Sequence, residues 1–352
     1  MILSEASRDV ATGTTRSTIW GGLAGVVMAA CSVFDIGAID ALVVRAAEFV
    51  NAGASTYVIE APQLVDGKAC QAIATLAGFQ AGAMREEPAT VATLLPSAPI
   101  PTYAVTDGLF DLVPAIEDLG GTGVLASAEV ADSLGIMPGG SIETSSGPVR
   151  VRGVFSWPPD GRRRGLAFAL LAPEVSAGRF DECWARRTPP QADMSGPLLA
   201  TLLPRAVEDS DSVSLLQLNP SLGEQLNGAR SFAGRPSRWA WCISLGGCLM
   251  VGLASVRARR LELASALHLG VSRGQLIGMM VLEWAWWTLI ALIAAAIASA
   301  WAVVAGSGAA PRALADAAAL VLGQGTAGSL IGVALGGASI RERALFRYSK
   351  SR

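Results

Sequence analysis

The chain has 352 residues, of which 51% are apolar and only 16% are charged, and its mean hydropathy is +0.45. This balance speaks against an ordinary soluble domain and indicates membrane spans. The net charge is −2, and no basic stripe interleaved with aromatic residues is present, so nothing in the composition favours a nucleic-acid partner.

The N-terminal region predicts a retained first span. Residues 1–16 carry Arg8 and Arg16, and residues 17–40 approach the run of about 20 apolar residues that crosses a bilayer. The stretch VMAACS, ending at Cys31, is similar to a lipoprotein signal, which would be cleaved. However, Met28 stands where leucine is usual and the apolar run continues to Ile39. A span that is kept is therefore favoured.

Residues 41–237 are long enough to form a domain with its own core. The β-rich STYVIEAP is followed by the helical pattern DGKACQAIATLAG, and such alternation favours an α/β unit. Further along, residues 124–125 suit a strand, residues 127–134 a short amphipathic helix, and residues 141–144 and 149–155 two more strands.

Several side chains of this segment leave two interpretations open. Cys70 and Cys183 are either free or joined by a disulfide, which persists in an oxidising compartment. The basic cluster Arg162, Arg163 and Arg164 and the acidic residues 208–211 are interpreted as solvated loops. The alternative for the basic cluster is contact with lipid headgroups or an acidic partner.

The C-terminal third predicts three more spans separated by charged segments. They are residues 238–256, 276–306 and 314–340, with a charged helix at 257–275, an outer loop at 307–313 and a tail at 341–352. Short cytoplasmic loops are rich in Lys and Arg. The segment 257–273 has four Arg against one Glu, and the tail has five basic residues against Glu342, so both are expected in the cytoplasm. An even number of spans also places residues 1–16 there and residues 41–237 outside the cell membrane.

The sequence offers little catalytic chemistry. It has no Gly-x-x-x-x-Gly-Lys-Ser/Thr loop for a nucleotide, and its single histidine, His268, removes every two-histidine metal site. We therefore expect no catalytic residues, no metal and no cofactor in this chain. Asp35 and Asp40 are expected to be solvated at the outer end of the first span. Glu283 lies deeper, where it could pair with an arginine, face a partner helix or lie near headgroups.

The charged segment carries a family resemblance. Residues 259–276, RRLELASALHLGVSRGQL, resemble the signature of the MacB, FtsX and LolC/LolE permeases, the type VII ABC transporters. The resemblance implies that this segment lies on an ATPase and transmits its opening and closing. Leu267, His268 and Gly274 depart from the Arg, Ala and Arg of the pattern. The coupling residues implied are Arg257, Arg259, Arg260, Glu262, Leu263, Leu267, Gly270, Ser272 and Arg273.

Two further features are similar to this family. The order of one span, a large outer domain and three more spans is the same, and RSTIWGGLAGVVMAA resembles a first span that follows an amphipathic segment, here residues 1–16. The stretch VLASAEVADSLGIMPGGSIETSSGPVRVRGVF is similar to an outer-domain pattern of the family. Residues 157–235 match no pattern. The implied fold has four transmembrane helices and an extracytoplasmic α/β domain, like the MacB periplasmic core, inserted between the first two.

The resemblance implies a non-catalytic permease subunit in the cell membrane, surrounded by lipids. A separate ABC ATPase subunit would bind ATP and Mg, and a second permease subunit would complete a homodimer or heterodimer. The expected activity is mechanotransmission for export of peptides or hydrophobic compounds. The alternatives are an FtsX-like regulator of a cell-wall hydrolase, with an extracytoplasmic protein partner, and a membrane-anchored sensor or adaptor without an ATPase.

Glycines recur at four-residue spacing in the first and last spans, and glycine lets helix backbones approach closely in lipid. They serve packing either within one subunit or between two. These glycines are Gly21, Gly25, Gly328, Gly332 and Gly336.

Overall fold

The computed structural model describes residues 17–114, 116–145, 147–190, 194–204, 213–223, 226–306 and 308–340. The chain divides into two compact units, a helical unit made of the residues up to Arg45 and from Gly228 onward, and a sheet unit, Ala46–Asn227. The expected cytoplasmic segment 1–16, the acidic residues 208–211 and the tail 341–352 lie outside the described residues.

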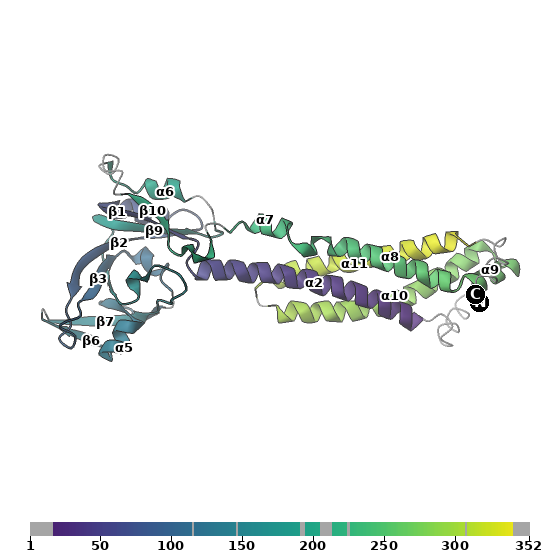
Figure 1. The fold of residues 1–352 in the computed structure, drawn as a ribbon, viewed down its shortest axis with the longest axis horizontal. Coiled ribbons are helices and arrows are strands. Elements are labelled where there is room, and N and C mark those ends of the chain that lie inside the picture. Colours follow the sequence, from purple (N-terminus) through teal and green to yellow (C-terminus); the bar gives the residue numbers. More distant parts are fainter. Residues whose placement is uncertain are drawn as a thin grey trace. The chain divides into compact units, whose positions relative to one another are not determined.

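Four helices are long and apolar enough to cross a bilayer, which makes the chain a multi-pass membrane protein. They are α2 (Ser17–Asn51), α8 (Ala240–Ala258), α10 (Arg273–Ala305) and α11 (Pro311–Ala338). Figure 1 shows α8, α10 and α11 running alongside the first part of α2. The expected fold class, four apolar helices with an α/β domain between the first two, is confirmed.

The two longest of these helices extend beyond the residues expected from hydropathy. Helix α2 continues to Asn51 because residues 38–52 contain neither glycine nor proline, and it ends where Gly53 adopts a φ of 76°. Helix α10 begins at Arg273 because Ser272 caps it. Hydropathy finds the part of a helix that lies in lipid, whereas caps and glycine set where the helix ends.

The glycines of the last helix bring α11 against the backbone of α8. A Cβ added to Gly328 or Gly332 would lie 2.1 Å from the carbonyl oxygen of Leu245 or Leu249. A Cβ on Gly336 would meet the side chain of Val256 at 2.8 Å. Only a residue without a side chain permits this approach.

Gly21 and Gly25 do the same for α2 and α10. An added Cβ would lie 2.8 Å from the Trp287 carbonyl oxygen and 3.3 Å from the Ala291 Cα, respectively. All five glycines singled out in the sequence therefore pack between helices of the same chain.

Two carboxylates of α2 are paired rather than solvated. Asp35, which the sequence places in water, is 5% exposed and forms an ion pair with Arg235 at 3.1 Å. Asp40 accepts hydrogen bonds from the backbone N–H groups of Gly308 and Ala309, in the turn between α10 and α11. The expectation of solvated carboxylates is wrong for Asp35, because an arginine 200 residues later supplies its partner.

The sheet unit is built on one mixed sheet of ten strands. Nine of them follow the order β10-β1-β9-β2-β3-β8-β5-β7-β4, and β6 pairs with β7. The pairs β3–β8 and β5–β7 are parallel and the others are antiparallel. The strands are β1 (Thr56–Asp66), β2 (Phe79–Thr90), β3 (Ile100–Val105), β4 (Ile116–Asp118), β5 (Val124–Ser127), β6 (Ser141–Thr144), β7 (Gly147–Phe155), β8 (Leu170–Pro173), β9 (Arg179–Arg187) and β10 (Ser214–Gln217).

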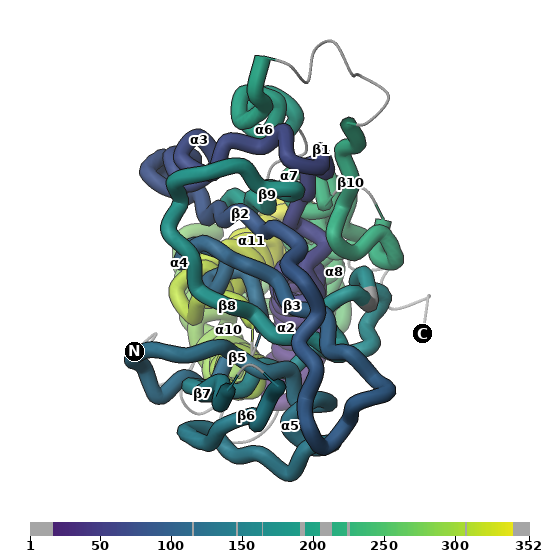
Figure 2. Tube along the Cα trace, turned by 90° about the vertical axis from the view of Figure 1, so that its left-hand side faces the viewer, coloured from purple at the N-terminus to yellow at the C-terminus, as the bar shows by residue number. Residues whose placement is uncertain are grey.

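Short helices connect and cover the strands. Helix α5 follows β5 and buries Val130 and Ala131, and Figure 2 shows it beside β6. Ser127 caps it, as the predicted helix at residues 127–134 requires. The short helices are α3 (Gly67–Ile73), α4 (Asp107–Phe110), α5 (Ala128–Leu134), α6 (Ser195–Leu199), α7 (Gly228–Ala233), η1 (Arg164–Leu166), η4 (Pro220–Leu222) and η5 (Pro236–Trp239).

Cys70 of α3 and Cys183 of β9 are joined by a disulfide, with their Cα atoms 5.9 Å apart. Both residues lie in the core between α3 and the sheet, together with Ile59 and Phe180. The bond attaches helix α3 to strand β9, which lies between β1 and β2 in the sheet.

The expectation of a solvated loop is wrong for Arg162 of the basic cluster, whereas Arg163 is exposed. Arg162 is 5% exposed, pairs with Asp160 at 2.7 Å and lies 5.0 Å from the Trp157 ring centre. It also donates a hydrogen bond to the carbonyl of Asn51, and Asn219 donates one to the carbonyl of Ala52. These two side chains satisfy carbonyl groups that a helix end leaves without partners. Composition suggests a charged surface, but an aromatic ring and a helix end give this arginine a buried position.

A second, partly buried polar cluster joins strands β1 and β9 to Arg163 in the loop after β7. Glu60 of β1 lies directly opposite Glu182 of β9, and Arg163 forms ion pairs with both carboxylates. Burial raises the pKa of Glu182, although the Trp184 N–H and Arg163 act in the opposite direction. One arginine thus holds two like charges together inside the sheet unit.

The packing of α11 on α8 predicts a sharp difference between two glycines of one helix. Gly332→Ala is expected to lower stability by about 1–3 kcal/mol, since the new methyl group collides with the Leu249 carbonyl. Gly323→Ala is the matched control, because no atom lies within 4 Å of its added Cβ. The thermal unfolding midpoint of the detergent-solubilised chain measures both. Equal midpoints for the two variants would contradict the close approach.

The raised pKa of Glu182 predicts that ionisation of this carboxyl group lowers the stability of the folded chain as the pH rises. The stability that comes from protonating this group in the folded chain is complete below the ordinary value of 4.5, and it is lost as the pH rises through the higher folded value. At pH values above the folded-state pKa, Glu182→Gln should therefore raise the thermal unfolding midpoint. At acidic pH it should change the midpoint little. Melting curves across pH, with the exposed Glu117→Gln as control, test this. A difference between wild type and Glu182→Gln that is constant with pH would rule it out.

Candidate functional site

The charged segment between the second and third apolar helices forms a separate helix, α9 (Arg260–His268). It buries Leu263, Ala264 and Leu267 in the same core as Val256, Leu276, Met280 and Val333. The leucines are four residues apart and share one face of the helix. Helix α9 is therefore docked on the ends of α8, α10 and α11 by its apolar side.

Arg259 is the polar centre of this junction. Its guanidinium forms ion pairs with Glu262 of α9, at 2.9 Å, and with Glu283 of α10. The side chains of Arg259 and Glu283 are only 14% and 12% exposed. Burial alone would lower the pKa of Arg259, but the hydrogen bonds to Glu283 and Glu262 raise it above its ordinary value. The guanidinium is charged at all physiological pH and links α9 to α10.

The turn into α10 explains another part of the signature. Gly270 adopts a φ of 91°, which disfavours residues with a side chain. Ser272 and Gln275 form a capping box, in which the serine hydroxyl accepts from the Gln275 N–H and the glutamine side chain accepts from the Ser272 N–H. Gly270, Ser272 and Gln275 thus have local structural roles in starting α10.

The side of α9 that faces away from the core forms an exposed surface, which we call the α9 surface. It consists of Arg257, Glu262, Ser265, His268 and Leu269. Leu269 is the one large apolar side chain of this surface, and 84% of its area is exposed. The family pattern assigned a role to Leu263 and Leu267, which are buried, and none to Leu269. Its position directly before the turn glycine was the available signal.

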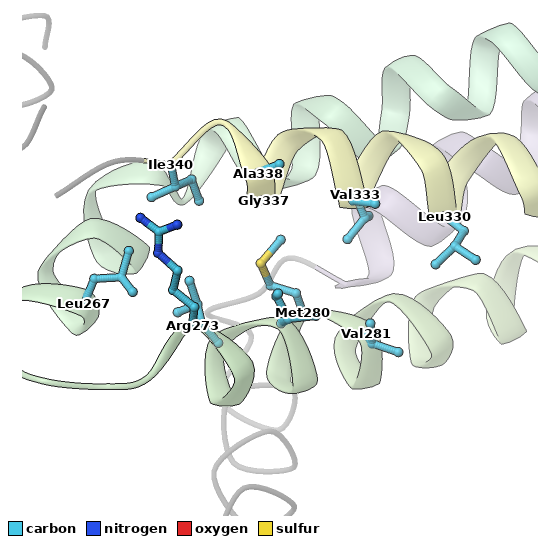
Figure 3. Close-up of a pocket in the computed structure, with 12 residues that line it drawn as sticks. Leu267, Arg273, Met280, Val281, Leu330, Val333, Gly337, Ala338 and Ile340 are labelled. Atoms are coloured by element: carbon cyan, nitrogen blue, oxygen red, sulfur yellow. The ribbon is translucent and has the colours of Figure 1, made fainter.

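Arg273 lies apart from the ion pairs of the junction. It opens α10 and lines an apolar groove of about 360 Å³ between α10 and α11, together with Leu267 and Ile340 (Figure 3). The structure therefore divides the implied coupling residues into four roles. Leu263 and Leu267 are buried, Arg259 and Glu262 form the ion pairs, Gly270 and Ser272 make the turn, and Arg273 borders the groove. Arg257 and Arg260 lie around the start of α9, where Arg257 is exposed.

No metal-binding group was found among the residues that the structure describes: they bring no three His, Cys, Asp or Glu side chains together in the way a metal ion needs. The residues of the α9 junction offer ion pairs and an exposed apolar side chain. Such an arrangement is suited to contact with another protein.

The chain matches no protein-family model and no curated protein. Among the solved structures that resemble it in part are three that each cover about half of the chain. The periplasmic region of MacB from Actinobacillus actinomycetemcomitans is 11% identical with a TM-score of 0.36, and it covers 48% of this chain and 91% of its own. The extracellular domain of the noncanonic ABC-type transporter YknZ from Gram-positive bacteria is 12% identical, with a TM-score of 0.30 and coverages of 46% and 99%.

The third structure is a domain of a protein described as a permease from Porphyromonas gingivalis. It is 15% identical, with a TM-score of 0.33, and covers 51% of this chain and 98% of its own. At these identities and TM-scores, none of the three likenesses establishes a family or an activity for the chain.

The ion pair between Arg259 and Glu283 predicts how firmly α9 is held. Glu283→Gln removes the more buried of the two carboxylates that pair with Arg259 and leaves Glu262, a change expected to cost about 1.5–3 kcal/mol. The backbone amides of residues 260–268 should then exchange hydrogen at least about tenfold faster. Hydrogen exchange read by mass spectrometry measures this, with the exposed Asp316→Asn on α11 as the matched control. Unchanged exchange in α9 would show that the pair does not hold the helix.

Proposed function

We propose that the chain is the permease subunit of a type VII ABC transporter of the MacB, FtsX and LolC/LolE kind. In this proposal it couples ATP hydrolysis by a separate ATPase subunit to conformational change in the sheet unit. The proposal rests on the signature at residues 259–276 together with the order of elements, one span, a mixed sheet and three more spans. The chain itself is non-catalytic, and the partner ATPase binds ATP and Mg.

The observation that carries the proposal is the α9 surface. A helix that buries its leucines against the ends of spanning helices lies outside the hydrocarbon, because its charged residues would be costly there. Its outer side nevertheless presents Leu269, 84% exposed, near Glu262, whose side chain is 56% exposed. Single apolar anchors ringed by polar groups are typical of protein interfaces. A cytoplasmic protein that covers Leu269 is therefore the partner that fits this surface.

A route for motion from α9 follows from contacts inside the helical unit. Arg259 connects α9 to Glu283 of α10, and α10 contacts Gly21 and Gly25 of α2 through its backbone. Helix α2 is continuous up to Asn51, where Arg162 binds its last carbonyl group. A partner shifts such a helix only if it contacts α9 differently in its two nucleotide states. Mechanotransmission thus requires ATPase contacts with the α9 surface that change on nucleotide binding.

The orientation that agrees with this role places α9 and both termini in the cytoplasm and the sheet unit outside. Arginines concentrated in the segment 257–273 support it. The disulfide in the sheet unit also agrees with an oxidising compartment. Export of peptides or hydrophobic compounds, by a pair of permease subunits, is the activity proposed for the assembly.

Leu269→Asp is expected to weaken ATPase binding at least about tenfold, because it places a charge where an apolar anchor is buried on assembly. Glu262→Arg should act in the same direction. Leu119→Asp, a change at a 70% exposed leucine of the sheet unit, is the matched control. The full chain is affinity-purified from its native cells, and the ATP hydrolysis that copurifies is measured.

Two results would count against the proposal. One is ATPase copurification that is equal for Leu269→Asp, Glu262→Arg and Leu119→Asp, or absent from wild type. The other is labelling of a cysteine placed at Glu262 by an impermeant reagent added to intact cells. A copurifying cell-wall hydrolase in addition to the ATPase would instead assign the same machinery to hydrolase control.

A further inference from the structure

A groove between α10 and α11 lies apart from the α9 surface on which the proposed ATPase partner would dock. It has a volume of about 360 Å³, within the range of about 300–1,000 Å³ that small-ligand sites have. Its walls are apolar side chains of the two spanning helices (Figure 3). They include Leu276, Met280 and Val281 of α10 and Leu330, Val333 and Gly337 of α11.

Small residues of α11 leave this space open. Ala334, Gly337 and Ala338 line the groove on that side, where larger side chains would fill it. A Cβ on Gly337 would already lie 2.9 Å from Cε of Met280. The groove is also open at its sides, since Ile277 and Val281 are 57% and 41% exposed. The occupant must therefore be slender and apolar along most of its length.

The end of the groove nearest α9 carries a cation. Arg273 extends there toward Leu267 and Ile340 (Figure 3). Among the described residues, no carboxylate forms an ion pair with it. The first turn of a helix favours anions and disfavours cations. Within the described part of the chain, no negative charge offsets the cost of an arginine at this position of α10.

We propose that this groove binds an anionic phospholipid, with its phosphate on Arg273 and one acyl chain between α10 and α11. The apolar walls lie on spanning helices, so the medium that reaches them is lipid. Arginine binds phosphate through two parallel N–H donors, and basic residues beside spans attract anionic headgroups. A neutral lipid could pack its acyl chain against the apolar walls but would offer no net negative charge to Arg273. A soluble phosphate could pair with Arg273 but would leave the apolar walls uncovered.

The lipid contacts the element that carries the α9 surface. Leu267 of α9 and Ile340, just beyond α11, both border the groove at its charged end. An occupied groove therefore fills the space next to the buried side of α9. Lipid binding in this groove requires only the spanning helices and α9, so it does not depend on an ATPase.

The test measures lipid binding by native mass spectrometry on the full chain, delipidated in detergent. Wild type is expected to bind dioleoylphosphatidylglycerol about fivefold more tightly than dioleoylphosphatidylcholine, the contribution of one basic residue near a headgroup. Arg273→Gln should remove this preference. Arg312→Gln should keep it, because that arginine is likewise in the first turn of a spanning helix but is not part of the groove.

A second variant tests the acyl-chain part separately. Ala334→Leu fills the groove from an exposed position of α11, and it should weaken binding of both lipids while the thermal unfolding midpoint stays unchanged. Equal affinities of wild type for the two lipids would overturn the proposal. Equal effects of Arg273→Gln and Arg312→Gln, or full binding by Ala334→Leu, would do the same.

Two other occupants are distinguished in the same spectra. If glycerol phosphate alone binds as tightly as the phospholipid, the site is one for soluble phosphate. If Ala334→Leu changes the fraction of dimer and not the lipid count, a second copy of the chain covers the groove. Either result overturns the lipid assignment. Because no ATPase is present in this experiment, its failure leaves the proposed coupling to an ATPase unaffected.

Discussion

The ion pair between Arg259 and Glu283 is the interaction on which the α9 end of the helical unit depends. A carboxylate in an apolar helix is costly unless a cation reaches it, and Arg259 reaches it from the break between α8 and α9. The pair fixes where α9 begins, so Leu263 and Leu267 meet the core and Leu269 remains outside. The buried charge therefore selects which side of α9 a partner can contact.

Close backbone packing is the second constraint on the helical unit. Lipid provides no hydrophobic drive between helices, so contact depends on small residues that let backbones approach. Gly328 and Gly332 do this between α11 and α8, and Gly21 and Gly25 between α2 and α10. The groove between α10 and α11 shows the opposite situation, in which small residues leave a space for another molecule.

Much of the architecture could be predicted from the sequence because its signals are local. Apolar run lengths reveal four spans, and the pattern from Ser127 to Leu134 predicts a capped helix that is present as α5. The interpretation failed where distant residues meet. Asp35 is buried because Arg235 pairs with it, and Arg162 is buried because Trp157 and the end of α2 surround it. No periodicity reports such contacts.

The candidate site shows the same division. The signature around residues 259–276 identifies α9, but it does not separate the residues that build the turn, such as Gly270, from the exposed Leu269. The strand order of the sheet, with parallel and antiparallel pairs mixed, also lay beyond the sequence. Both depend on three-dimensional packing of segments far apart in the chain.

The disulfide between α3 and β9 has a consequence for how the protein is made. Its two cysteines are 113 residues apart, so the bond can close only after both have been synthesised, and in the folded unit Cys183 lies on β9 between β1 and β2. Thiol oxidation requires a compartment with an electron acceptor for the pair. Covalent closure of the sheet unit therefore requires an oxidising compartment, and a reducing one would leave two unbonded thiols in the core between α3 and the sheet.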